Sequence, residues 1–379
     1  MAKKIEVPVM RKEFFIAFLL FINLAQAKTI VVGIKTNHLS AKDKAVLGLQ
    51  GGDTIMLEAG DRGAIQFADI DGNADNYITI INAEGLCEIK EATLPYGISL
   101  RNCHYVRLSG NGSAKIPYGI KIAEVTRDGA GLGISDKSDN IEVCYLEISN
   151  TKGPGILCKT NPDCITDRDN YTSVNTSIHN NYVHHTGTEG MYIGSTAFEG
   201  SKIRCDSALV TRFPPLLKNV AVYENVVEYT GWDGIQISDA IDVECFGNKI
   251  SYDSQKDEPW QNCGLIIGGG ASGRFYQNVI SFGKGYPINC FGTGEVEIRD
   301  NEIVMDITST KTAIYVNDKL ATQQTKYLID GNTIDTKHLP AIVIINRKQR
   351  KPDLIKDNKV KGASTADAVS FEGTKPIIK

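Results

Sequence analysis

The chain has 379 residues, of which 42% are hydrophobic and 23% are charged, a balance typical of a folded globular protein rather than a disordered or collagen-like chain. Forty-one Lys and Arg against 45 Asp and Glu give a net charge of −4, so no broad basic surface for nucleic acid is expected. Glycine is abundant (36) while proline is modest (12), which indicates many tight turns rather than a flexible linker.

Residues 1–27 have the pattern of a secretory signal peptide. A basic start is followed by an apolar run at 14–24 that is too short to span a bilayer comfortably, and the AQA triplet at 25–27 fits a cleavage site between small residues. No cysteine stands at this site, so no lipid anchor is indicated. We therefore expect residues 28–379 to form a periplasmic, cell-surface or secreted domain with no later membrane span.

The first element expected in this domain is a short helix at 40–49. Ser40 is a suitable N-cap residue, and Ala45, Val46 and Leu49 give the segment an apolar side. We expect this helix to cover the N-terminal end of the repeats that follow, because the open end of a repeat array needs a cap. The tail at 362–379 is expected to finish the other end.

A repeated unit with the pattern small-apolar-x-apolar then runs along the chain at a spacing of about 22 to 30 residues. Short strands of period 2 that recur at this spacing predict a β-solenoid in which successive coils stack about 4.8 Å apart. A similar pattern at 118–122 comes too soon before the next unit, so we interpret 111–130 as an irregular or inserted segment. The units begin at Gly97, Gly131, Gly155, Gly190, Gly234, Gly264, Pro287, Ala313, Ala341 and Ala368.

A second unit, Asn-x-apolar, is offset from the first. Asparagine tolerates the left-handed turn conformation, and its amide can bond to the asparagine of the next coil. The variable coil length favours an all-β, single-domain, right-handed parallel β-helix of about ten or eleven coils. The asparagines are Asn181, Asn225, Asn248, Asn278, Asn301, Asn332 and Asn358.

Two long insertions, at about 160–176 and 196–217, follow equivalent strands of adjacent coils. We expect them to project from one side and wall a cleft, because loops of this length in a compact domain usually serve function. The nine cysteines are an odd number, so at least one is unpaired within the chain. Cys158 and Cys290 fall at buried repeat positions, and a disulfide between Cys164 and Cys205 would join the two insertions.

Glu189 and Asp233 are the candidate catalytic pair. Each precedes the glycine that opens a repeat on consecutive coils, so their carboxyl groups could lie at the separation that glycosidases use. Like charges at that distance raise the pKa of one group and make an acid beside a base. Two alternatives to catalysis remain for this pair. The carboxylates could accept backbone N–H bonds in turns, or they could bind Ca²⁺. Strict alternation would aim both side chains at the core.

Lys159 points out of the preceding coil and could be the base of a lyase, or it could bind an acidic sugar together with Arg168. Tyr192 and Gln236 alternate outward on the two coils that carry the candidate pair. A tyrosine beside amides and acids suits sugar binding through ring stacking and hydroxyl contacts. Ordinary solvated or packing roles are the alternative for each of these residues.

The two tryptophans, Trp232 and Trp260, each precede a strand near this region and could be sugar platforms, with Asn262 beside the second. His185 could border the cleft, because Glu189 follows shortly after it. The HNNYVHH segment at 179–185 has no second cluster with metal-ligand spacing beside it, so no zinc site is expected.

The repeat, the secretion signal and the Gly-Asp-Thr-Ile segment at 52–55 resemble the pectate-lyase-like right-handed parallel β-helices. These are secreted polysaccharide lyases, polygalacturonase-type hydrolases and related carbohydrate-active proteins. Thr188-Glu189-Gly190 only echoes the Asn-Thr-Asp of polygalacturonases, and their other catalytic patterns and the pectate lyase arginine motif are missing. The resemblance implies the fold and a carbohydrate ligand, and it leaves the chemistry open.

Three functions therefore stand as expectations. The first is a glycoside hydrolase that uses Glu189 and Asp233, with no required cofactor. The second is a polysaccharide lyase that acts on a uronate-containing glycan with Lys159 as base and Ca²⁺ as a possible cofactor. The third is a non-catalytic glycan-binding solenoid, favoured if the two carboxyl groups point into the core. In each case we expect a monomer whose partner is a polysaccharide or oligosaccharide.

Overall fold

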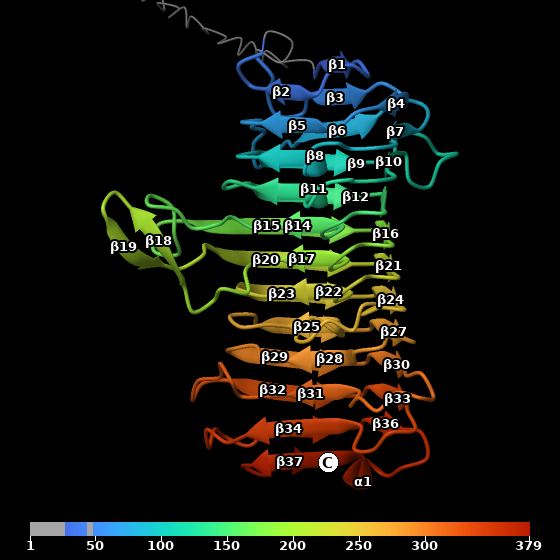
Figure 1. The fold of residues 1–379 in the computed structure, drawn as a ribbon, viewed down its shortest axis with the longest axis vertical. Coiled ribbons are helices and arrows are strands. Elements are labelled where there is room, and N and C mark those ends of the chain that lie inside the picture. The colour runs from blue at the N-terminus through green and yellow to red at the C-terminus, as the bar shows by residue number, and fades with distance from the viewer. Residues whose placement is uncertain (1–26, 44–47) are drawn as a thin grey trace, which may run out of the picture.

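The computed structural model describes residues 27–43 and 48–379, and this part of the chain winds into a parallel β-helix (Figure 1). Each coil visits three sheets in turn, and consecutive coils pair through parallel strands. The all-β architecture predicted from the repeat is confirmed. The predicted signal peptide lies outside the described residues, apart from Ala27.

Three long parallel sheets contain all but two of the described strands. The first sheet has 13 strands: β1 Thr29–Val32, β3 Thr54–Leu57, β6 Ile78–Asn82, β9 His104–Ser109, β12 Asp139–Cys144, β15 Thr172–His179, β20 Leu216–Tyr223, β23 Ala240–Phe246, β26 Gly273–Tyr276, β29 Glu295–Arg299, β32 Lys326–Asp330, β35 Leu354–Lys356 and β38 Ile377–Ile378. The second has 11: β4 Gly60–Arg62, β7 Cys87–Ile89, β10 Ile120–Ile122, β13 Leu146–Ser149, β16 Tyr182–His184, β21 Val226–Glu228, β24 Lys249–Ser251, β27 Val279–Ser281, β30 Glu302–Val304, β33 Thr333–Asp335 and β36 Lys359–Val360. The third has 12: β2 His38–Ser40, β5 Ile65–Ala68, β8 Tyr96–Arg101, β11 Ala130–Ser135, β14 Ile156–Cys158, β17 Met191–Ile193, β22 Ile235–Ile237, β25 Cys263–Ile267, β28 Tyr286–Cys290, β31 Ile314–Val316, β34 Ile342–Asn346 and β37 Val369–Gly373.

The core is a set of apolar columns that run along the axis of the helix. In the third sheet, Ile156, Met191, Ile235 and Leu265 pair in register on successive coils, and all four are fully buried. Burial of such side chains is the main favourable contribution to folding. The same register places the glycines at 190, 234 and 264 in one column, as the repeat predicts.

The predicted number of coils agrees with the sheets, since eleven coils within the described residues carry a strand on all three faces. The interpretation of 111–130 as an irregular or inserted segment fits 111–119, which carry no strand between β9 and β10, but it is wrong for the residues that follow. Ile120–Ile122 is β10, which pairs with β7 and β13 in the second sheet. Its pattern resembles that of the third-sheet repeat because a half-buried strand of any face has the same alternation.

The repeated asparagines form a buried ladder between the first and second sheets. The side chain of Asn225 donates to Asn248 Oδ1 at 3.0 Å, and that of Asn248 donates to Asn278 Oδ1 at 2.9 Å. The expected amide-to-amide bonds are therefore present. The expected left-handed backbone belongs instead to the residue before each asparagine, as at Asn180 (φ 52°) and Glu224 (φ 53°).

The N-terminal end of the solenoid differs from the prediction of a helix that starts at Ser40. Ser40 ends strand β2 by pairing with Ala68, so it is not the N-cap residue of a helix there, and residues 44–47 of the predicted helix lie outside the described part. At the other end, helix α1 (Thr365–Ala368) precedes β37 of the last coil. No helix among the described residues has the length and apolarity to cross a membrane.

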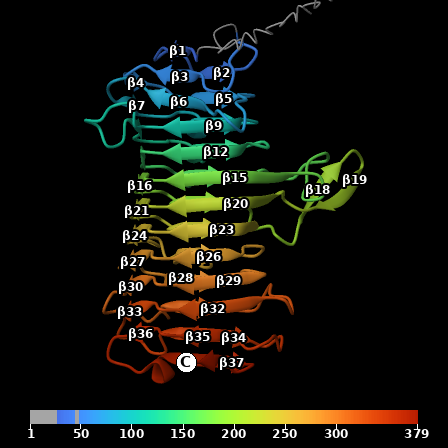
Figure 2. The ribbon, with the colours of Figure 1, turned by 180° about the vertical axis from the view of Figure 1, so that it is seen from behind.

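An antiparallel hairpin, β18 (Ser201–Cys205) and β19 (Ala208–Arg212), projects from the corner opposite the second sheet (Figures 1 and 2). It belongs to the segment between β17 and β20. A disulfide between Cys164 and Cys205 joins it to the segment between β14 and β15. Arg212 reinforces the junction through an ion pair with Asp167 at 2.8 Å. The other seven cysteines are buried thiols, and Cys158 and Cys290 lie in the core as predicted.

Candidate active site

Glu189 and Asp233 occupy the same place on consecutive coils, immediately before β17 and β22. The backbone N–H of Gly190 donates to the carbonyl oxygen of Asp233 at 2.9 Å, which fixes the two coils in register at this point. Both side chains are buried, with exposed fractions of 3% for Glu189 and 0% for Asp233. Buried carboxyl groups are costly unless hydrogen bonds satisfy them, so their partners decide what this pair can do.

Gln261, from the segment before β25, bridges the two carboxyl groups. Its amide is assigned with the nitrogen facing them, because the opposite orientation would set oxygen against oxygen. The nitrogen then donates to Asp233 Oδ2 at 2.9 Å and to Glu189 Oε1 at 3.2 Å. These two oxygens are therefore no more than about 6 Å apart, close to the spacing of carboxyl pairs in retaining glycosidases. The other oxygen of Asp233 accepts the N–H of Cys263 at 2.8 Å.

The electrostatics of this pocket favour protonated carboxyl groups. Burial raises the pKa of Asp233 well above its ordinary value, and the nearby charges of Glu189 and Asp253 raise it further. Burial also raises the pKa of Glu189, while Lys159 opposes that shift. Two carboxyl groups, one held neutral and one beside a cation, are suited to act as a proton donor and a proton acceptor.

Lys159 and Tyr192 lie together on the outer side of the third sheet. The Lys159 Nζ sits 4.7 Å from the centre of the Tyr192 ring, in a cation–π contact, and both side chains are half-buried. The Tyr192 hydroxyl bonds to Thr196 Oγ1 at 2.9 Å. The structure thus brings Lys159 and Tyr192 together, and both side chains are more accessible than the carboxyl pair.

A groove of about 560 Å³ lies over the coils that follow the carboxyl pair. Trp260 stands at its edge with 92% of its surface exposed, and Asn262 lines it two residues further along. Aromatic rings with amides and charged groups between them are typical of sugar-binding clefts. The lining residues are Trp260, Asn262, Tyr286, Asn289, Phe291, Tyr315, Asn317, Asp318, Lys319, Ile345 and Arg347.

Gln236 does not present its side chain for sugar contact as the alternation predicted. Only 1% of its surface is exposed, and its Nε2 has no hydrogen-bond partner. Gln236 lies between Tyr192 and Ile266 of the neighbouring strands, and Phe198 and Leu320 lie against Gly269 just beyond the end of β25. Trp232 is half-buried and is not among the groove residues, and its backbone joins Thr188 and Ser254 through hydrogen bonds of 3.1 and 2.8 Å.

Arg168 and His185 lie apart from the groove and make other contacts. The Arg168 guanidinium forms an ion pair with buried Asp239 at 2.9 Å and donates to the carbonyl oxygens of Phe198 and Pro214, so its donors hold the two insertions together. His185 is exposed at a corner of the helix, where its ring stacks on Tyr229 at 5.0 Å. Neither residue is placed to contact a ligand in the Trp260 groove.

Several residues of this region were missed by the sequence analysis. Tyr315 and Asn289 could have been found, because each is the outward middle residue of a repeat unit, and the two pair in register. Gln261 and Asp253 carried no such signal, since they belong to the irregular segment between β24 and β25.

Away from this site, one further group of side chains in the described part of the chain could hold a metal ion. It consists of Glu142, Cys144 and His179, whose ligand atoms lie close together.

The part of the chain that the structure describes has the architecture of a parallel β-helix, and solved structures of this fold are similar to it. A lacto-N-biosidase of family GH136 from Eubacterium ramulus is similar at a TM-score of 0.56 and 12% identity, over 91% of this chain and 67% of that one. An alginate lyase from Paenibacillus sp. str. FPU-7 is similar at 0.53 and 15%, over 92% and 99%. A family 28 exopolygalacturonase from Yersinia enterocolitica is similar at 0.50 and 10%, over 93% and 78%.

At these identities the likeness shows the fold alone. No sequence-family model matches the chain, and no curated protein matches it.

Proposed function

We propose that this protein binds a polysaccharide along the Trp260 groove and cleaves it where Glu189 and Asp233 lie. The observation that carries the proposal is an aromatic groove whose residues Trp260 and Asn262 flank Gln261 in the chain, while the Gln261 amide nitrogen bridges two buried carboxyl groups. A secretion signal at 1–27 would bring the enzyme to polysaccharides outside the cytoplasm. The solved structures of the same fold include enzymes whose names describe action on glycans, and this agrees with the proposal.

In this mechanism Asp233 is the acid and Glu189 is the carboxylate. Asp233 is the more deeply buried group, and its raised pKa keeps a proton available for the leaving-group oxygen of the glycosidic bond. Burial raises the pKa of Glu189 as well, but its own backbone N–H, Thr188 and Lys159 oppose that shift, so Glu189 gives up its proton more readily than Asp233. The short spacing of the two groups favours direct attack by Glu189 and retention of the anomeric configuration.

Substrate access requires that the Gln261 amide leaves its position between the carboxyl groups. The segment that carries Gln261 is held at both ends, where Ser254 N–H donates to Trp232 O and Cys263 N–H donates to Asp233 Oδ1, each at 2.8 Å, while Trp260 beside Gln261 is almost fully exposed. A sugar hydroxyl and the glycosidic oxygen would replace the two hydrogen bonds that Gln261 gives up.

A second candidate, a polysaccharide lyase, is favoured by the accessibility of Lys159 and Tyr192. Lys159 would remove the proton next to a uronate carboxylate, and Tyr192 would protonate the leaving oxygen. Ca²⁺ could assist by neutralising the uronate. A non-catalytic glycan-binding solenoid is the third candidate, because both carboxyl groups are buried in this conformation.

Product analysis over a panel of neutral and uronate-containing polysaccharides separates the three. Hydrolysis gives saturated fragments with one water added at each cut, whereas elimination gives unsaturated sugars that absorb in the near ultraviolet. Binding without new reducing ends supports the third candidate and contradicts cleavage. We expect saturated products, and we expect Trp260→Ala to weaken binding at least tenfold because the exposed ring is lost. Exposed Tyr252→Ala, outside the groove, is the control and should bind normally.

A further inference from the structure

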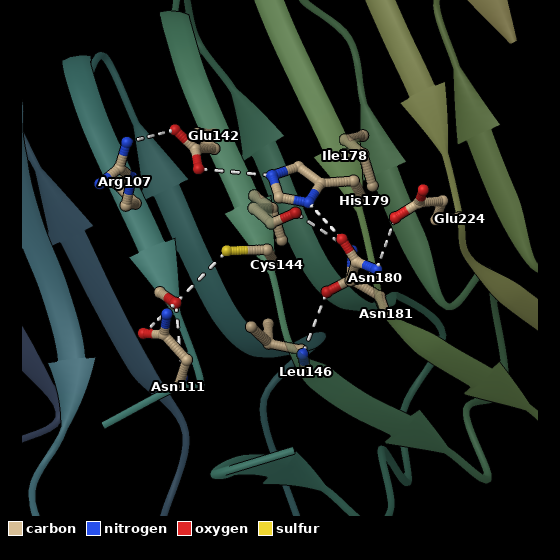
Figure 3. Close-up of polar contacts among 12 residues, drawn as sticks. Arg107, Asn111, Glu142, Cys144, Leu146, Ile178, His179, Asn180, Asn181 and Glu224 are labelled. Carbon is tan, nitrogen blue, oxygen red and sulfur yellow. Dashed lines mark hydrogen bonds and ion pairs between the residues drawn. The ribbon is translucent and has the colours of Figure 1, made fainter. Parts of the chain in front are cut away.

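A second cluster of reactive side chains lies on the first sheet, away from the groove. Glu142 and Cys144 are alternate residues of β12, so they share one face, and Cys144 pairs in register with His179 of β15. The Glu142 carboxylate oxygen, the Cys144 Sγ and the His179 ring nitrogen all lie within 4.8 Å of one another (Figure 3). Sequence reasoning did not expect this cluster, because 37 residues separate His179 from Glu142 and only the stacking of coils brings them together.

The surroundings of His179 direct one ring nitrogen into the cluster. Its Nδ1 lies 2.8 Å from Asn180 Oδ1, an acceptor, so Nδ1 is assigned as the donor. Its ring is held by parallel stacking on Tyr223, with centroids 4.6 Å apart. Nε2 is then directed at Glu142 Oε1, 3.3 Å away, and either a proton on Nε2 or a metal ion can join these two atoms.

Glu142 and Cys144 are arranged to complete such a site. Arg107 binds the other carboxylate oxygen, Oε2, at 2.9 Å, which orients the carboxylate and leaves Oε1 directed at His179. Cys144 is 98% buried, and its thiol donates a weak hydrogen bond to Ser109 Oγ at 3.3 Å. Outer contacts of this kind, to Asn180 and Arg107, commonly orient metal ligands.

We propose that Glu142, Cys144 and His179 bind a zinc ion. The mixed sulfur, nitrogen and oxygen donors match zinc and do not match calcium or magnesium, which prefer oxygen. The 3.3 Å between Nε2 and Oε1 is close to the edge of a tetrahedron whose ligands lie about 2.0–2.1 Å from the metal. Binding would release the thiol proton of Cys144 to solvent and leave a fourth position for water. The site is on a different face from the groove, so its failure would leave the proposed function untouched.

Cobalt titration of the chelator-treated full chain tests the proposal, because a thiolate bound to Co²⁺ gives an intense charge-transfer band in the near ultraviolet. We expect this band to saturate at one equivalent and to disappear when Zn²⁺ is added. Cys144→Ser should abolish it, and Glu142→Gln should weaken cobalt binding at least tenfold. His184→Gln is the matched control, because His184 faces Glu147 at 3.5 Å without a cysteine, and it should titrate like the parent chain.

Three outcomes would overturn the zinc site. The first is no band at millimolar cobalt in a chain whose circular dichroism shows intact β structure. The second is a band that persists unchanged in Cys144→Ser. The third is an equal loss of affinity in His184→Gln and Glu142→Gln. If Cys144→Ser does not fold, Glu142→Gln and His179→Gln decide the question, because both side chains are partly exposed and can be exchanged without opening the core.

Discussion

Asp253 is a buried carboxyl group that the proposed chemistry does not use. It lies at the corner before the third sheet, where its Oδ2 approaches the backbone of Gly283 so closely that any side chain there would collide with it. Ser254 Oγ donates to its Oδ1 at 2.6 Å, but Oδ2 has no hydrogen-bond partner. Burial raises the pKa of Asp253 to about 6, so the folded protein holds this group protonated more readily than the unfolded chain does.

This shift predicts a fall in stability as the pH rises. Asp253 stabilises the fold fully below about pH 4, and that contribution is lost as the pH rises through about 6, at a cost of up to about 3 kcal/mol. Asp253→Asn cannot ionise, so we expect urea unfolding from pH 4 to 8 to show a smaller fall than in the parent chain. Asp206→Asn, in the exposed hairpin turn, is the control. An unchanged fall in Asp253→Asn would refute the assignment.

At the scale of single residues, the sequence predicted partners that share a column and missed those that come from loops. Glu189 and Asp233 were placed together because both precede a repeat glycine. The burial of Gln236 and the bridging by Gln261 depend on the packing of side chains and loops, and no periodic signal encodes such packing.

Among the structural elements, the asparagine ladder shows most directly how a sequence repeat stabilises the fold. Each amide bonds to the next coil and to a backbone carbonyl, so these buried polar groups are satisfied without water. The strands, their order and the amide bonds of the ladder follow from the repeat. The residue with the left-handed backbone conformation is the one before each ladder asparagine, so the chain turns between the first and second sheets at that residue.

Asn248→Ala is expected to destabilise the protein by roughly 3–5 kcal/mol, because it leaves the Asn225 N–H and the Val222 carbonyl buried without these partners. Asn219→Gly is the control. Asn219 is exposed, and glycine accepts its positive φ of 56°, so this change should alter the unfolding free energy by less than about 1 kcal/mol. Equal shifts of the urea midpoint in the two variants would contradict a stabilising role for the ladder.

For the whole molecule, the solenoid is a rigid frame that presents different chemistry on different faces. The third sheet carries the carboxyl pair and the Trp260 groove, while the first sheet carries the Glu142, Cys144 and His179 cluster. The insertions joined by the Cys164–Cys205 disulfide project from the corner between these two sheets (Figure 2). The frame could be predicted because it repeats, whereas the choice among hydrolase, lyase and binder depends on features that occur once.

The most direct test of the central claim is the turnover number of Glu189→Gln on a polysaccharide that the parent chain cleaves. Glutamine preserves the shape and the burial of the side chain but can neither attack as a carboxylate nor exchange a proton. We predict a fall in kcat of at least about 100-fold, with KM and the urea midpoint little changed. Turnover equal to that of the parent chain would contradict cleavage by the Glu189–Asp233 pair.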